Sequence, residues 1–129
     1  MRIFIASADK TSRIALQLLL ESEPGMVVIG IADRAEGLLT LVGASQPEVL
    51  LLDYELARQT TVTLISDLRH LEQPPIIIVL SINVQVKPMV LAAGADAFIS
   101  KNVPPDELLP ILRTMRRSKV TAQTPTGYQ

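Results

Sequence analysis

Five short, continuous apolar runs separated by helix-like segments are the feature that most constrains the fold of this chain. Their apolar residues are consecutive rather than alternating, which is typical of strands covered on both faces. The segments between them are long enough for the crossover helices that parallel strands require. The sequence therefore predicts a five-stranded parallel sheet between two layers of helices, a three-layer α/β/α sandwich. The five runs are residues 3–6, 26–32, 49–52, 76–80 and 97–99.

Capping residues and prolines indicate where the helices begin and end. Asp9 and Asp33 are candidate N-caps of the first two helices. Pro88 is tolerated only in a first turn, and Gly94 suits the end of the same helix. From residue 118 onward the sequence is polar and aperiodic, so we expect one domain over 1–117 and a polar tail or the start of a linker over 118–129. The helices are expected over 11–21, 34–44, 61–70, 86–93 and 106–117.

Composition narrows the class of protein. At 129 residues, 48% of them hydrophobic, the chain is long enough for one domain with a real core. It contains no cysteine, which excludes a disulfide framework and a thiol nucleophile. No run approaches the roughly 20 apolar residues of a membrane span, and the first residues lack a signal-peptide pattern, so we expect a cytoplasmic protein. A net charge of −1 and 3% aromatic residues argue against direct nucleic-acid binding.

Polar side chains follow three of the apolar runs. Asp53 closes the third run, Ser81 closes the fourth, and Lys101 follows the fifth. The carboxyl ends of parallel strands meet at one edge of the sheet, where open α/β folds bind their ligands. An acid, a hydroxyl and an amine at this edge favour a site that handles phosphoryl groups.

The residues around these positions resemble the response-regulator receiver family. Residues 94–101 (GADAFISK) resemble the family's G-A-x-x-[YF]-x-x-K segment, and residues 47–53 (PEVLLLD) resemble the run that ends in its phosphoacceptor. Residues 23–30 (EPGMVVIG) are similar to receivers that precede a LuxR/NarL-type helix-turn-helix domain. The resemblance spans roughly residues 1–117 and implies the flavodoxin-like (CheY-like) fold with (βα)5 order.

The resemblance also implies a role for each site residue. Asp53 would accept a phosphoryl group from a histidine kinase or another phosphodonor, with Mg²⁺ offsetting the charge. Ser81 and Lys101 would hold phosphoryl oxygens, and Phe98 would be the switch aromatic that follows Ser81. The chain would then be a signalling module rather than an enzyme. DNA contact would come only through an output domain outside this sequence.

The first strand departs from the family pattern. The two adjacent acids that hold Mg²⁺ in the family fall on Ser7 and Ala8. Mg²⁺ prefers carboxylate oxygens, so the candidate metal ligands are Asp53 with Asp9 and Glu55 as replacements. Asp9 also has the simpler interpretation of capping the first helix.

Three functions are compatible with these residues. The first is a phosphorylation-dependent receiver, in which Lys101 has the structural alternative of a permanent ion pair with Asp53. The second is a phosphorylation-independent pseudo-receiver that acts as a dimerisation or interaction module, favoured by Ser7 and Ala8. The third is a flavodoxin-like cofactor binder, although residues 7–12 contain no glycine to cradle a phosphate. The apolar face of the first helix is wider than one sheet contact needs, so it would meet the last helix or, in a homodimer, a second copy of the chain.

Overall fold

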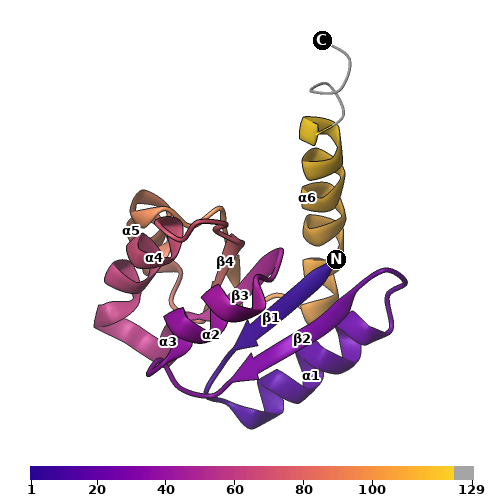
Figure 1. The fold of residues 1–129 in the computed structure, drawn as a ribbon. Coiled ribbons are helices and arrows are strands. Elements are labelled where there is room, and N and C mark those ends of the chain that lie inside the picture. Colours follow the sequence, from indigo (N-terminus) through magenta and orange to yellow (C-terminus); the bar gives the residue numbers. More distant parts are fainter. Residues whose placement is uncertain (124–129) are drawn as a thin grey trace.

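The computed structural model describes the backbone of residues 1–123 and the side chains of residues 1–116 (Figure 1). Its centre is a parallel sheet of five strands in the order β2-β1-β3-β4-β5. The predicted sheet is confirmed, and each apolar run lies in one strand apart from Met26, which precedes the second strand. The strands are β1 (Arg2–Ala6), β2 (Val27–Ala32), β3 (Val49–Asp53), β4 (Ile76–Ser81) and β5 (Ala97–Ser100).

The three inner strands are buried on both faces, which is why their sequences are continuously apolar. All five residues of β3 are buried, as are the last four of β1 and the last five of β4. Paired residues of adjacent parallel strands point to the same face, so Ile5, Leu51 and Ile78 line one side of the sheet. Phe4, Leu50 and Ile77 line the other side.

Helices cover both faces and complete the three layers (Figure 1). On one face α1 (Lys10–Glu21) and α6 (Leu108–Gln123) contribute Leu20, Leu108 and Leu112 to a buried cluster. On the other face α2 (Leu38–Ser45), α4 (Thr61–Arg69) and α5 (Lys87–Ala93) pack on a second cluster. Short elements join them: α3 (Tyr54–Ala57), η1 (Arg58–Thr60), η2 (Val84–Val86) and η3 (Pro105–Glu107). Of the helices in the described part of the chain, none is both long and apolar enough to cross a membrane.

Three predicted helix signals are confirmed. The side chain of Asp9 caps α1 by accepting from the amide of Thr11. Pro88 lies in the first turn of α5, where its missing amide proton leaves no helical bond unmade. Gly94 ends α5 with a φ of 121°, a conformation that strains any residue with a Cβ.

Two predicted helix boundaries are wrong. Asp33 does not cap the second helix, because residues 33–37 form bends and a turn, and α2 begins only at Leu38 after Gly37. Gly37 adopts a left-handed φ of 78°, which directs the chain into the helix without any side-chain cap. The last helix continues to Gln123 instead of ending at residue 117. Residues 118–123 contain no proline or glycine, so nothing in this segment interrupts the helical backbone. In Figure 1 this end of α6 extends past the sheet.

Candidate functional site

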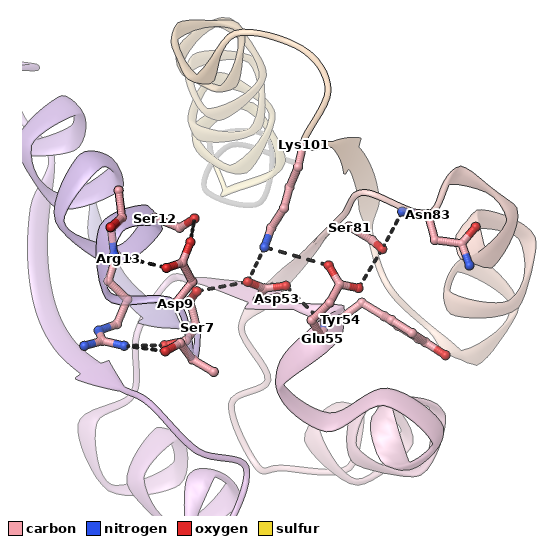
Figure 2. A network of polar contacts seen from close by, with 12 residues as sticks. Ser7, Asp9, Ser12, Arg13, Asp53, Tyr54, Glu55, Ser81, Asn83 and Lys101 are labelled. Atoms are coloured by element: carbon pink, nitrogen blue, oxygen red, sulfur yellow. Dashed lines mark hydrogen bonds and ion pairs between the residues drawn. The ribbon is translucent and has the colours of Figure 1, made fainter.

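Three strand ends bring the predicted site residues together at the carboxyl edge of the sheet (Figure 2). Asp53 is the last residue of β3, and Ser81 is the last residue of β4. Lys101 follows β5 directly and donates its backbone amide to the carbonyl of Ser81. The predicted convergence of acid, hydroxyl and amine is therefore present in the structure.

Asp53 is the centre of the site and is held from three sides. Its side chain is almost completely buried, with the whole residue 3% exposed. Oδ2 accepts a hydrogen bond from Ser7 Oγ at 2.9 Å and forms an ion pair with Lys101 Nζ. Oδ1 accepts from the backbone amide of Glu55 at 3.1 Å, so that Asp53 also caps α3. These donors compensate the desolvation of the carboxylate and fix its orientation.

Ser81, at the end of β4, is hydrogen-bonded to Glu55, the acid two residues after Asp53. It is fully buried, and its Oγ donates to Glu55 Oε2 at 2.9 Å. The same oxygen accepts from the backbone amide of Asn83 at 3.0 Å. The hydroxyl therefore points toward the edge of the sheet and has both a donor and an acceptor partner.

The Lys101 ammonium lies between two carboxylates (Figure 2). Besides its ion pair with Asp53, its Nζ lies 3.8 Å from Glu55 Oε1. Oε1 is buried and has no hydrogen-bond partner among the described residues, so this ion pair is its polar contact. A single cation thus serves both acids of the site.

The loop after β1 is organised differently from an acidic pocket. Asp9 Oδ1 accepts from the Thr11 amide at 3.3 Å, and Oδ2 accepts from Ser12 Oγ at 2.6 Å. The hydrogen bond from Ser12 is the main reason that the pKa of Asp9 lies below its ordinary value. Asp9 is therefore engaged as the cap of α1, which agrees with the simpler of its two interpretations.

Arg13 supports the same loop, a contact that the sequence did not reveal. Its guanidinium donates to the carbonyl of Ser7 at 2.9 Å and to that of Ala8 at 3.2 Å. Ser7 itself is 2% exposed and directs its hydroxyl at Asp53. At the position where the family carries an acid, this chain has a hydrogen-bond donor to the central carboxylate.

Phe98 lies on β5, outside this hydrogen-bonded network. It pairs with Val79 in the sheet register and is partly buried against the cluster beneath α2, α4 and α5. It lies two sheet positions before the level of Ser81, which pairs with Ser100. The structure thus places the predicted switch aromatic on the neighbouring strand, close in register to the hydroxyl that it is predicted to follow.

Comparison with known proteins identifies the family. The model of the response regulator receiver domain matches residues 3–113, and the chain belongs to this family. Its members are the signal-receiving domains of two-component response regulators. No curated protein sequence matches the chain significantly. The family assignment favours the first of the three functions and does not favour the phosphorylation-independent alternative.

Solved structures confirm the flavodoxin-like receiver fold. The signal receiver domain of the putative response regulator NarL from Mycobacterium tuberculosis is 22% identical, with a TM-score of 0.80 over 90% of this chain and 95% of that one. The REC domain of AraT from Geobacillus stearothermophilus is 18% identical, with a TM-score of 0.82 over 95% and 97% of the two chains. A LuxR-family response regulator from Aurantimonas sp. SI85-9A1 is 20% identical, with a TM-score of 0.80 over 88% and 83%.

The residues present do not fit the Mg²⁺ that receiver domains typically bind in an acidic pocket. Among the residues that the structure describes, no group of three or more acidic, histidine or cysteine side chains is placed to hold a metal ion. Asp9 caps a helix, and the two remaining acids, Asp53 and Glu55, share the Lys101 ammonium. Mg²⁺ requires near-octahedral oxygen ligands, and the Ser7 hydroxyl already donates its proton to Asp53.

Sequence reasoning placed Glu55 near the site but missed its contacts. It was expected to replace a metal ligand, whereas its carboxylate bonds Ser81 and faces Lys101. The four-residue helix α3 is the reason, because it starts at Tyr54 and fixes Glu55 in the first turn, over the strand ends. The signal in the sequence is the acid two residues after Asp53, where an N-cap directs the backbone into a turn.

Proposed function

We propose that this chain is a phosphorylation-dependent receiver whose phosphoacceptor is Asp53. The observation that carries the proposal is the arrangement around the Asp53 carboxylate, with the Lys101 ammonium in contact and the Ser81 hydroxyl directed to the same edge of the sheet. A buried carboxylate at a ligand-binding edge, beside one cation and one hydroxyl, matches the chemistry of an acyl phosphate.

The proposed reaction is an in-line phosphoryl transfer. An Asp53 carboxylate oxygen attacks phosphorus, a phosphorus–oxygen bond forms, and the bond to the donor's imidazole nitrogen breaks, leaving the electron pair on the nitrogen. Catalysis of such a transfer depends on positioning and on charge stabilisation rather than on protein covalent chemistry beyond the acceptor. Lys101 would offset the charge on the phosphoryl oxygens, and Ser81 would donate a hydrogen bond to one of them.

The partners follow from this role. We infer a sensor histidine kinase or another phosphodonor as the source of the phosphoryl group. We also infer a cytoplasmic location and a DNA-binding output domain of the LuxR/NarL type, joined to the receiver after α6. The likeness of the chain to receivers of LuxR-family regulators supports this arrangement.

A homodimer through α1 is a second prediction with a specific observation behind it. Leu20 is buried and Leu16 packs on the core, but Ile14 and Leu18 on the same helix are 47% and 67% exposed. Packing within the described chain therefore leaves part of the apolar face uncovered. Sedimentation at high micromolar concentration should show a dimer that Leu18→Glu abolishes, and a monomer at every concentration would refute the prediction.

The phosphoacceptor role is tested with beryllofluoride, a mimic of an acyl phosphate, by amide NMR with and without Mg²⁺. Saturable changes at residues 53, 81 and 101 are expected, and they should be absent from Asp53→Asn. Asp9→Asn is the matched control, because asparagine still caps the helix and the contacts of Asp53 are unchanged. Identical responses of the wild type and Asp53→Asn would exclude Asp53 as the acceptor.

A further inference from the structure

Glu55 occupies the two groups that a phosphoryl group on Asp53 would need. Its Oε2 accepts from Ser81 Oγ at 2.9 Å, and its Oε1 lies 3.8 Å from Lys101 Nζ (Figure 2). Ser81 and Lys101 belong to different strand ends, so one side chain bridges them across the mouth of the site. The Glu55 carboxylate thus presents two anionic oxygens to the same hydroxyl and the same ammonium that phosphoryl oxygens would contact.

The backbone holds Glu55 in this position. Asp53 caps α3 by accepting from the Glu55 amide at 3.1 Å, so the orientation of the phosphoacceptor and the origin of the Glu55 side chain are linked. The Glu55 side chain is 32% exposed. It therefore borders solvent and has room to leave the site, unlike Ser81, which is fully buried.

We propose that Glu55 is an internal competitor of the phosphoryl group and positions Ser81 and Lys101 while Asp53 is unmodified. This inference rests on the proposed role of Asp53 as phosphoacceptor. A phosphoryl group carries about two negative charges near neutral pH, and in the site it meets a second carboxylate with Lys101 as the cation shared by both acids. Phosphorylation must therefore displace Glu55 from Ser81 and Lys101 into solvent, and this displacement opposes modification.

The competition has a consequence for the unmodified state. Because Glu55 keeps Ser81 bonded at the site edge, the hydroxyl has the same kind of anionic acceptor before phosphorylation as after it. The position of Ser81 would then differ little between the two states of the wild type. Removing the Glu55 carboxylate would free Ser81, and phosphorylation would then move it.

The experiment uses amide NMR of the whole chain and three variants. Glu55→Ala removes the competing carboxylate, and Glu55→Gln keeps an acceptor for Ser81 but removes the charge facing Lys101. Asp9→Asn is the control, an acid removed from the same edge of the sheet without a contact to Ser81. Each spectrum is recorded without ligand and then during a titration with beryllofluoride.

Two results are expected. Without ligand, Glu55→Ala should shift the amides of residues 81–83 and 101, and Glu55→Gln should shift residue 101 more than residue 81. Asp9→Asn should leave the amides of residues 81–83 unshifted. Beryllofluoride should bind Glu55→Ala at least about tenfold more tightly than the wild type, the range expected when one charge-assisted hydrogen bond no longer has to be broken.

Three outcomes would contradict the inference, and they refute different parts of it. Unchanged ligand-free spectra in Glu55→Ala would show that Glu55 does not position Ser81 and Lys101. Equal beryllofluoride affinities of the wild type and Glu55→Ala would overturn the competition while leaving Asp53 as the acceptor. An absence of binding in both would refute the acceptor role and the competition together, whatever the ligand-free spectra show.

Discussion

Replacing Ser7 by aspartate tests how the site balances its charge. Ser7 is 2% exposed and donates to Asp53 Oδ2 at 2.9 Å. The substitution removes this donor, which costs roughly 1.5–3 kcal/mol for a hydrogen bond to a charged group. It also places a second carboxylate roughly 4 Å from the Asp53 carboxylate. Two like charges at this distance repel by about 4 kcal/mol at an effective dielectric constant of about 20.

Protonation limits the total cost of Ser7→Asp. Protonating a carboxylate with an ordinary pKa of about 4 at pH 7 costs about 4 kcal/mol, because each pH unit above the pKa adds about 1.4 kcal/mol. This is less than the sum of the two penalties, so the variant should be destabilised by at most about 4 kcal/mol at pH 7. The new carboxyl pair binds a proton more tightly in the folded than in the unfolded chain, so the loss of stability should grow as the pH rises.

Urea unfolding between pH 5.5 and pH 8 in a chelating buffer measures this effect, with Ser7→Ala as the matched control. The control loses only the hydrogen bond, so its destabilisation should be smaller and nearly independent of pH. Millimolar Mg²⁺ should restore part of the stability of Ser7→Asp, because a ligand that binds only the folded state stabilises it, and should leave Ser7→Ala unchanged. Equal, pH-independent losses in the two variants would refute the reasoning.

Three further substitutions test the packing and the surface electrostatics. A Cβ on Gly30 would lie 2.5 Å from the ring of Phe4, so Gly30→Ala should destabilise the fold by about 1–3 kcal/mol in thermal unfolding. Gly43→Ala within α2 is the control and should stabilise the fold by about 0.5–1 kcal/mol. Equal effects of the two substitutions would contradict the predicted clash. Arg113 donates to both carboxylate oxygens of Glu23, at 2.7 and 2.8 Å, and this hydrogen bonding lowers the pKa of Glu23 from its ordinary value of 4.5. The stabilisation is therefore present above that value and is lost as the pH falls through the lower folded-state pKa. The stability advantage of the wild type over Glu23→Gln should be larger at pH 6 than at pH 3, and equal differences at the two pH values would contradict this.

The sequence was sufficient for the sheet and for the principal residues of the site. Continuous apolar runs indicate doubly covered strands, and parallel strands place their carboxyl ends at one edge. Asp53, Ser81 and Lys101 each follow directly from the end of a run, so their convergence needs no information about side-chain direction. The capping role of Asp9 could be predicted for a similar reason, since it depends only on local backbone geometry.

Features that depend on turn conformation could not be predicted in the same way. The start of α2 is set by the left-handed backbone of Gly37, whereas the sequence indicated Asp33 as the cap. The contacts of Glu55 depend on α3, a helix of four residues that is too short to leave a periodic pattern. The hydrogen bond from Ser7 to Asp53 depends on how the residue after β1 and the last residue of β3 orient their side chains toward each other.

The central claim is that Asp53 becomes phosphorylated, and chemical mapping of the acceptor tests it most directly. The chain is incubated with a small phosphodonor such as acetyl phosphate, and any acyl phosphate is reduced with borohydride, which converts a modified aspartate to homoserine. Peptide mass spectrometry should find homoserine at position 53 in the wild type and none in Asp53→Asn. Homoserine at another acid, or an unmodified Asp53 in a chain that also gains no phosphoryl group from a histidine kinase, would contradict the account.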